Sequence, residues 1–445
     1  MEPKLALLGG EPAVTAAHPH EPWPPPAAQE ELDRLARQRV DDINIRGNAG
    51  PIGELEEAFR EELAPESRYA VAFNSGTSAL LAAYVGVGVG PGDEVVGPEL
   101  TYHAALSPAF VLGARVRTAD IERGSRCLDP ASVEAAVTER TRAVVVVHQW
   151  GHPADVDGLL RVCDKYDLPL IEDCSHAHGT TYKGRAVGTF GTAGAFSLQT
   201  NKAVFAGEGG ILVTSDPLVK DRAILLGHYR DRAKSDVEDE SLRRHWVSGF
   251  GLKLRMSPFN AVVALASLRA FPALRDERAR CLTYFRSRLA EIPYLEHVSV
   301  PSGDSMGAWY GFKPLYLPEE LGVSRATLVR ALQAEGVEVD APSAPPLSTL
   351  PLYDDPVALY GGRAPSGRLA PVEHPVAAHV GAHALSLPTF YRWDSDREVI
   401  DQYVAAFSKV YEHRHALVEW ERSAVGVQPG AAPAALPRDA VGAGR

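Results

Sequence analysis

Lys202 is the residue whose setting most strongly suggests chemistry. It lies in the segment AFSLQTNKAVFAGEGG (195–210), among small and apolar residues, in a chain with only nine lysines. Burying a strongly hydrated ammonium costs free energy unless the amine has a partner or a reaction to perform. Such an amine can form a Schiff base with an aldehyde cofactor when its pKa is lowered. The alternative is a lysine that buries its stem and keeps its amine in solvent.

A second motif, NSGTSAL (74–80), could bind a phosphate group. It places Ser-Gly-Thr between a predicted strand and a predicted helix. Backbone N–H groups at a helix N-terminus bind anions, and the hydroxyls of Ser75 and Thr77 could add donors. Taken alone, the same residues also make an ordinary helix cap.

Two further motifs place a carboxylate and an aromatic ring after predicted strands. Asp173 lies in IEDCSHAHG (171–179) and Tyr102 in PELTYHAA (98–105). In open α/β sheets, ligands gather outside the carboxyl ends of the strands. There the acid could hold a charged ring nitrogen and the tyrosine could stack on a ring. A surface acid and a core tyrosine are the simpler explanations for each residue alone.

Together these groups match the needs of pyridoxal 5'-phosphate. This cofactor requires an imine-forming lysine, a carboxylate at its pyridine nitrogen, a phosphate cup and an aromatic neighbour. The carboxylate keeps the ring nitrogen protonated, so that the ring can accept electrons from a carbanion at the substrate carbon. The combination therefore indicates carbonyl–amine chemistry.

The elements that must position these groups alternate along the chain. Between residues 50 and 265, predicted strands alternate with predicted helices, and strands such as AVVVV (143–147) are wholly apolar. This pattern indicates a mostly parallel sheet covered by helices on both faces. The strands TAGAFSLQ and GGILVTS flank the lysine too closely for a crossover helix, so we expect an antiparallel hairpin there.

The chain is long enough for more than one domain. A helical run after residue 256 contains Pro272, where we expect a break, and residues 340–380 are proline-rich and loop-like. We expect these regions: an N-terminal arm and helix over 1–45, a large cofactor-binding domain over 46–265, a small α+β domain over 266–420 and a disordered tail over 421–445.

Composition excludes several other classes of function. The formal net charge of −12 over 445 residues argues against a nucleic-acid partner. No apolar run approaches the ~20 residues that cross a bilayer, so we expect no membrane segment. The four cysteines form no CxxC pair. We therefore expect no metal site and reduced thiols in a cytoplasmic protein.

The motifs resemble those of a known family, the DegT/DnrJ/EryC1/StrS sugar aminotransferases, over about residues 40–415. These enzymes have the aspartate-aminotransferase architecture, also called fold type I. The matching segments are NSGTSAL, GDEVVGPELTYHAA, VVVHQWGHPADVDGL, IEDCSHAHGTTYKGRAVGTFG and FSLQTNKAVFAGEGG. The resemblance implies pyridoxal phosphate as cofactor, with pyridoxamine 5'-phosphate formed in the half-reaction.

The resemblance also implies roles for individual residues. Lys202 would bind the cofactor covalently and carry the proton, and Asp173 would pair with the ring nitrogen. Tyr102 would stack on the ring. The phosphate would be held by the cup residues Ser75, Gly76, Thr77 and Ser197.

Two positions depart from the family pattern. His176 stands where the family usually has a glutamine beside the cofactor ring. Lys253, in GFGLKLRMSP (249–258), stands where many members have an asparagine that reaches the phosphate of the neighbouring subunit. A lysine could make the same contact. If it does, the functional unit is a homodimer with shared active sites.

The resemblance predicts transamination from glutamate or glutamine to a keto-sugar, keto-cyclitol or related carbonyl compound, in secondary metabolism such as antibiotic biosynthesis. Candidate substrate contacts are Arg46, Asn48, Arg230 and polar residues of the segment 340–380, although a structural role is the simpler interpretation of each. Two alternatives stay open: a different reaction on the same cofactor, and a non-catalytic relative that only binds it.

Overall fold

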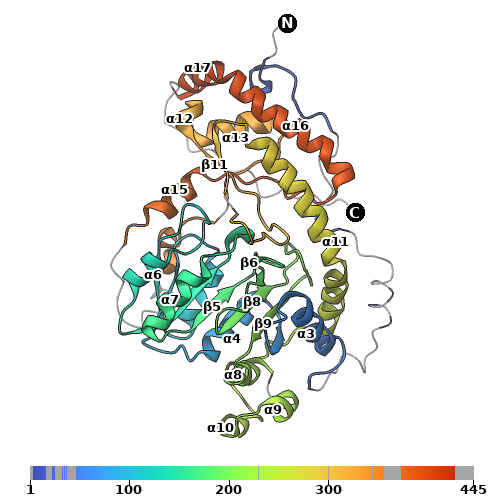
Figure 1. The fold of residues 1–445 in the computed structure, drawn as a ribbon, viewed down its shortest axis with the longest axis vertical. Helices are drawn as coiled ribbons and strands as arrows, with labels where there is room; N and C mark the ends of the chain where they lie inside the picture. Colours follow the sequence, from blue (N-terminus) through green and yellow to red (C-terminus); the bar gives the residue numbers. More distant parts are fainter. Residues whose placement is uncertain are drawn as a thin grey trace.

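The computed structural model consists of a large sheet domain and a smaller helical domain, joined by one long helix (Figure 1). It describes residues 4–16, 23–25, 47–228, 230–298, 300–342, 344–354 and 372–425, with single positions at 33, 35 and 37. The helix predicted within residues 1–45 falls largely outside these residues.

A seven-stranded sheet forms the centre of the large domain, in the order β1-β9-β8-β5-β4-β2-β3. Only β9 runs antiparallel to its neighbours, β1 and β8, and the other pairings are parallel. The mostly parallel sheet and the antiparallel hairpin around Lys202 are therefore confirmed. The strands are β1 Tyr69–Phe73, β2 Glu94–Pro98, β3 Arg115–Ala119, β4 Thr141–Val147, β5 Leu170–Asp173, β8 Ala193–Ser197 and β9 Gly210–Thr214.

Helices cover both faces of this sheet because its strands are apolar on both sides. In β4, Val145 and Val147 pack with α4, α5 and α8, whereas Val144 and Val146 pack with α6 and α7. Near the other edge, α3 covers β1, β8 and β9 together with the start of α11. The helices are α3 Gly50–Leu63, α4 Gly76–Gly86, α5 Ser107–Val111, α6 Pro130–Ala136, α7 Val156–Tyr166, α8 Pro217–Gly227 and α11 Pro258–Leu289.

The helix α11 connects the two domains and continues through Pro272, so the predicted break is wrong. Its first half, including Leu265 and Phe271, is buried in the core of the large domain. Its second half, including Phe285 and Leu289, is buried in the small domain. Packing of both halves outweighs the local cost of a proline inside the helix.

The small domain combines helices with a two-stranded sheet. Its core also takes up Leu5 and Val14 from the N-terminal segment. Two helices interrupt the stretch 340–380 that was expected to be a loop: α14 lies within it and α15 begins in it. The helix α17 extends to Val425, past the expected start of the disordered tail. The elements are β10 Leu295–Glu296, β11 Leu315–Tyr316, α12 Pro318–Leu321, α13 Arg325–Ala334, α14 Pro351–Asp354, α15 Pro375–His383, α16 Trp393–Glu412 and α17 Arg414–Val425.

Several short elements also occur among the described residues. They are the 3₁₀ helices η1 Ala6–Leu8, η2 His103–Ala105, η3 Gln149–Gly151 and η4 Leu347–Thr349, the strands β6 Thr181–Tyr182 and β7 Arg185–Ala186, and the helices α9 Asp231–Asp236 and α10 Glu240–Arg243.

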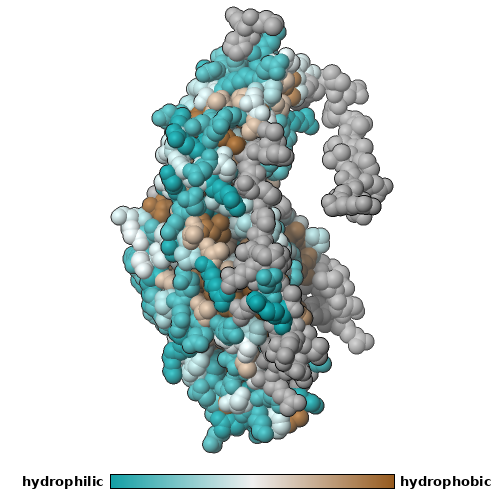
Figure 2. All heavy atoms as spheres, turned by 90° about the vertical axis from the view of Figure 1, so that its right-hand side faces the viewer, coloured by the Kyte–Doolittle hydropathy of each residue, from teal (hydrophilic) through white to brown (hydrophobic). Residues whose placement is uncertain are grey.

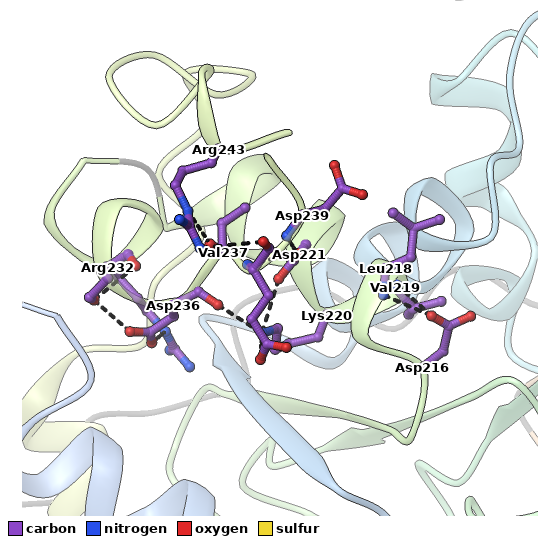
Figure 3. Close-up of polar contacts among 12 residues, drawn as sticks. Asp216, Leu218, Val219, Lys220, Asp221, Arg232, Asp236, Val237, Asp239 and Arg243 are labelled. Atoms are coloured by element: carbon purple, nitrogen blue, oxygen red, sulfur yellow. Dashed lines mark hydrogen bonds and ion pairs between the residues drawn. The ribbon is translucent and has the colours of Figure 1, made fainter. Parts of the chain in front are cut away.

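Polar contacts hold α9 and α10 against α8 (Figure 3). The buried Lys220 Nζ lies 3.0 Å from Asp221 Oδ1 and donates to Glu238 Oε1 at 2.8 Å. Asp221 Oδ2 accepts from the backbone N–H groups of Glu238 and Asp239. This network fixes the small helices below the sheet, away from its carboxyl edge (Figure 1).

The surface in Figure 2 is mostly hydrophilic, and its hydrophobic side chains gather in small patches. Among the described helices, none combines the length and the apolar character needed to cross a membrane. Several exposed apolar side chains come from one segment between α10 and the start of α11: Val247, Phe250, Leu252 and Phe259.

Candidate active site

The register of the sheet brings the predicted groups together at one edge. Val147, Asp173 and Ala195 are neighbours across β4, β5 and β8, where these parallel strands end. On the other side of β8, Ser197 pairs with Gly210 at the start of β9. The loop that carries Lys202 leaves β8 and returns as β9, so it must pass over the end of β5.

A cavity of about 770 Å³ lies over this edge. Eight of the predicted site residues line it. They are Ser75, Gly76, Thr77, Tyr102, Asp173, His176, Ser197 and Lys202.

The phosphate cup forms where β1 turns into α4. Ser75 caps the helix by accepting from Ser78 N–H at 3.1 Å through its Oγ. A Cβ on Gly76 would lie 2.6 Å from the Cβ of Ser197, so only glycine allows this approach. Among the described residues, no hydrogen-bond acceptor faces the N–H groups of Gly76 and Thr77, the first two of the helix. These free donors suit an anionic oxygen.

Lys202 and Asp173 are both buried, with exposed fractions of 8% and 5%. Burial lowers the pKa of Lys202 from 10.5 to about 8, although the charge of Asp173 opposes this shift. Burial also raises the pKa of Asp173, against the hydrogen bond from Ser175 and the charge of Lys202. Both shifts favour uncharged forms, because burial outweighs the attraction between the two groups. A further cation beside the acid would restore its charge.

A buried hydrogen-bonded pair, His148 and Glu172, lies next to Asp173. His148 Nε2 lies 3.0 Å from Glu172 Oε2, and the same carboxylate accepts backbone N–H groups from Gly188, Phe190 and Gly191. Burial alone would raise the pKa of Glu172, but these hydrogen bonds hold it below its usual value. The contacts tie the ends of β4 and β5 together and so fix the position of the neighbouring acid.

An aromatic layer lies beside the lysine. Tyr310 stacks on His176 with ring centroids 3.9 Å apart, and Lys202 Nζ lies 4.1 Å from the centroid of the Tyr310 ring. Burial and the charges of the cavity lysines hold the pKa of His176 well below its usual range, so this ring is neutral. Tyr102 lines the cavity but is 57% exposed in the single chain.

Several cavity residues were not predicted from the sequence. Tyr310 and Lys313 come from the segment before β11, and Gln149 and Trp150 follow β4. The scarcity of lysine, which drew attention to Lys202, would also have singled out Lys313, in the segment AWYGFKP. No local sequence pattern predicts that this segment of the small domain lines the cavity.

The remaining predicted residues do not line this cavity. Arg46 lies outside the described residues. Asn48 borders a separate cavity of about 520 Å³ beside α3 and α8. Arg230 is exposed directly before α9, and Lys253 is exposed before α11. Within one chain, none of the described three can be assigned a substrate or phosphate contact.

The donor set fits pyridoxal phosphate. Three buried polar atoms that border the cavity have no partner among the described residues: Thr101 Oγ1, Gln149 Oε1 and His176 Nδ1. Buried polar groups are normally hydrogen-bonded, so these atoms indicate a polar ligand. The free amides of α4, the buried acid and the amine with a lowered pKa match its phosphate, ring nitrogen and aldehyde, respectively.

The lowered pKa of Lys202 gives a direct prediction for the cofactor-free protein. Only the neutral amine reacts with acetic anhydride, so trace labelling of Lys202 should reach half its maximum near pH 8. Asp173→Asn removes a charge that favours the ammonium, so the midpoint should move to lower pH.

Lys165 provides the control for this titration. It is an exposed lysine paired with Glu134, which raises its pKa. Its labelling should therefore require a higher pH than that of Lys202, as followed by peptide mass spectrometry. A Lys202 midpoint near 10.5 would contradict the assignment.

Comparisons with known proteins agree with this geometry. The model of the DegT/DnrJ/EryC1/StrS aminotransferase family matches residues 30–402. A putative L-glutamine:3-amino-2,3-dideoxy-scyllo-inosose aminotransferase from Micromonospora echinospora is 34% identical over 349 residues, which cover 76% of this chain and 79% of that protein.

Two solved structures show the same fold. The aminotransferase from Psychrobacter cryohalolentis superposes with a TM-score of 0.75 at 28% identity, covering 89% of this chain and 100% of that one. DesI, solved in the presence of its TDP-sugar product, gives a TM-score of 0.75 at 27% identity. The superposition covers 94% of this chain and 98% of DesI. The predicted fold class is confirmed. The chain belongs to the DegT/DnrJ/EryC1/StrS aminotransferase family and is a pyridoxal-phosphate-dependent aminotransferase.

Proposed function

We propose that this enzyme transfers the amino group of L-glutamine to a keto-cyclitol or keto-sugar in secondary metabolism. The observation that carries the proposal is the buried amine of Lys202 beside the buried carboxyl of Asp173, in a cavity that the free N-terminus of α4 also lines. The named activity of the relative from Micromonospora echinospora supports a glutamine donor and a cyclitol acceptor. A cavity of about 770 Å³ has room for the cofactor and a small polyol.

Lys202 would be the proton carrier. Bound pyridoxal phosphate supplies the electron sink for the substrate carbanion. The Nζ atom of Lys202, with a pKa of about 8, is partly neutral near neutral pH and can accept a proton from the substrate carbon and return it. Asp173 would hold the cationic ring nitrogen.

The remaining site residues would bind the cofactor and orient it and the lysine amine. The amides of Gly76 and Thr77 and the hydroxyls of Ser75 and Ser197 would bind the phosphate. Tyr310 limits where the amine of Lys202 can move, because the ring lies directly beside it. Tyr102 would cover the cofactor ring, and His176 would hydrogen-bond to it.

We also propose a homodimer in the cytoplasm. The exposed apolar residues Val247, Phe250, Leu252 and Phe259 surround Lys253, which supports burial of this segment against a second copy. From there Lys253 would reach the phosphate of the partner's site. Any substrate role of Asn48 or Arg230 would likewise require the partner. The four cysteines are buried and unpaired, as suits a reducing compartment.

The function is tested with purified holoenzyme, L-glutamine and scyllo-inosose as a model acceptor. The wild-type protein should convert its cofactor to pyridoxamine phosphate with glutamine and form an aminocyclitol on addition of the ketone. Lys202→Ala should lower multiple turnover to background, whereas Lys165→Ala should leave it unchanged. Mass spectrometry of the cofactor and of the aminocyclitol product measures the two half-reactions separately. Full turnover by Lys202→Ala would refute the mechanism, and an elimination product would indicate a different reaction.

The cup gives a separate prediction for cofactor affinity. Gly76→Ala would place a Cβ 2.6 Å from Ser197 Cβ and 2.9 Å from its Cα, so the turn must move. Affinity of the apoenzyme for pyridoxal phosphate, measured by absorbance titration, should fall by at least about tenfold, the equivalent of one lost charged hydrogen bond. Gly90→Ala is the matched control, because its Cβ would meet nothing within 4 Å. Equal affinities for both variants would contradict the assigned cup.

A further inference from the structure

The cavity holds a second lysine, Lys313, which is half-buried in its lining and which the proton transfer described above does not use. Its Nζ donates to Ser386 Oγ at 2.5 Å and lies 5.9 Å from the centroid of the Trp150 ring. Among the described residues, no carboxylate forms an ion pair with it. Burial lowers its pKa to about 8, and no neighbouring charge opposes the shift. An ammonium has three donors, so a single neutral hydroxyl leaves Lys313 poorly compensated.

The charged residues of the cavity lining leave Lys313 without a counter-charge. Among the described lining residues, Lys202 and Lys313 are the only lysines or arginines. Asp173 compensates Lys202. Asp340, the acid nearest in the fold to Ser386, is exposed and accepts from Gln333 Nε2 at 3.3 Å. Glu208, the third acid of the lining, is exposed, and among the described residues it forms no ion pair with Lys313. The lining therefore offers one half-buried cation that no described acid pairs with, and an anionic ligand group would supply the counter-charge.

The position of Lys313 indicates which anion it would meet. It follows Tyr310 by three residues, and Tyr310 lies between His176 and the amine of Lys202. Lys202, Lys313 and His176 line the same cavity. The cofactor phosphate has its own cup at α4. The donor group that must come near Lys202 is the carboxylate on the reacting carbon.

We infer that Lys313 binds the α-carboxylate of the amino donor, with Ser386 holding the amine in place. The inference rests on the proposed function, because it assumes an amino acid donor. In glutamine the side chain is a neutral amide, so the α-carboxylate is its only anionic group. Lys313 would thus select amino acids over simple amines as donors.

Binding of unreactive probes tests this without turnover. Glutaramate is glutamine without its amino group, and glutaramide replaces the carboxylate by an amide. Wild-type holoenzyme should bind glutaramate more tightly than glutaramide by about ten- to a hundredfold, the usual strength of a charged hydrogen bond. Lys313→Met should remove this preference, Lys313→Arg should keep part of it, and Lys165→Met, a surface control, should keep all of it. Calorimetry gives the dissociation constants.

A kinetic comparison separates failure of this inference from failure of the proposed function. Conversion of the cofactor is followed with L-glutamine and with L-glutaminamide, which lacks the carboxylate. Lys313→Met should slow the first donor selectively and leave the second almost unchanged. If Lys313→Met does not retain cofactor, Lys313→Gln carries the same test.

The outcomes are distinct. An undiminished preference for glutaramate in the Lys313 variants, or equal loss with both donors, would overturn the role of Lys313 while leaving transamination intact. A wild-type holoenzyme that converts no amino acid would overturn the proposed function, whereas the probe affinities would still report on Lys313.

Discussion

The structure depends on keeping an amine and a carboxyl group buried beside each other at the edge of a parallel sheet. Lys202 and Asp173 are both almost inaccessible, and burial shifts the pKa of each toward its neutral form. Such a pair is costly in a protein that only needs to fold. It suits a ligand that brings a positive ring nitrogen to the acid and an aldehyde to the amine. Binding of such a ligand would offset the free-energy cost of burying these two side chains.

The surrounding elements serve this pair. The parallel strands end at one edge, so β4, β5 and β8 deliver His148, Asp173 and Ser197 to the same place. The antiparallel return of β9 closes the lysine loop over that edge, and its first residue, Gly210, lies against the turn before α4. The contacts of Glu172 with His148 and three backbone amides then hold the strand ends in register. The large domain thus provides Lys202, Asp173 and the phosphate cup, and the small domain provides Tyr310 and Lys313 on the other side of the cavity.

The sequence was sufficient for the parts that depend on local pattern. The alternation of apolar strands and helices predicted the sheet, and the short spacing around Lys202 predicted the hairpin. The break at Pro272 was wrong because packing of α11 into two cores overrides a local preference. Tyr310 and Lys313 were missed because their place in the cavity depends on how the small domain docks, which involves residues distant in the sequence. Arg230 lies directly before α9 and does not line this cavity, so its substrate role stays a prediction.

The most direct test asks which amine carries the cofactor, because two lysines line the same cavity. Borohydride reduction of the holoenzyme fixes the cofactor to its lysine, and peptide mass spectrometry then locates it. The account predicts a phosphopyridoxyl group on the peptide that contains Lys202 and none on the peptide that contains Lys313. A label on Lys313, or holoenzyme with no labelled lysine, would contradict it.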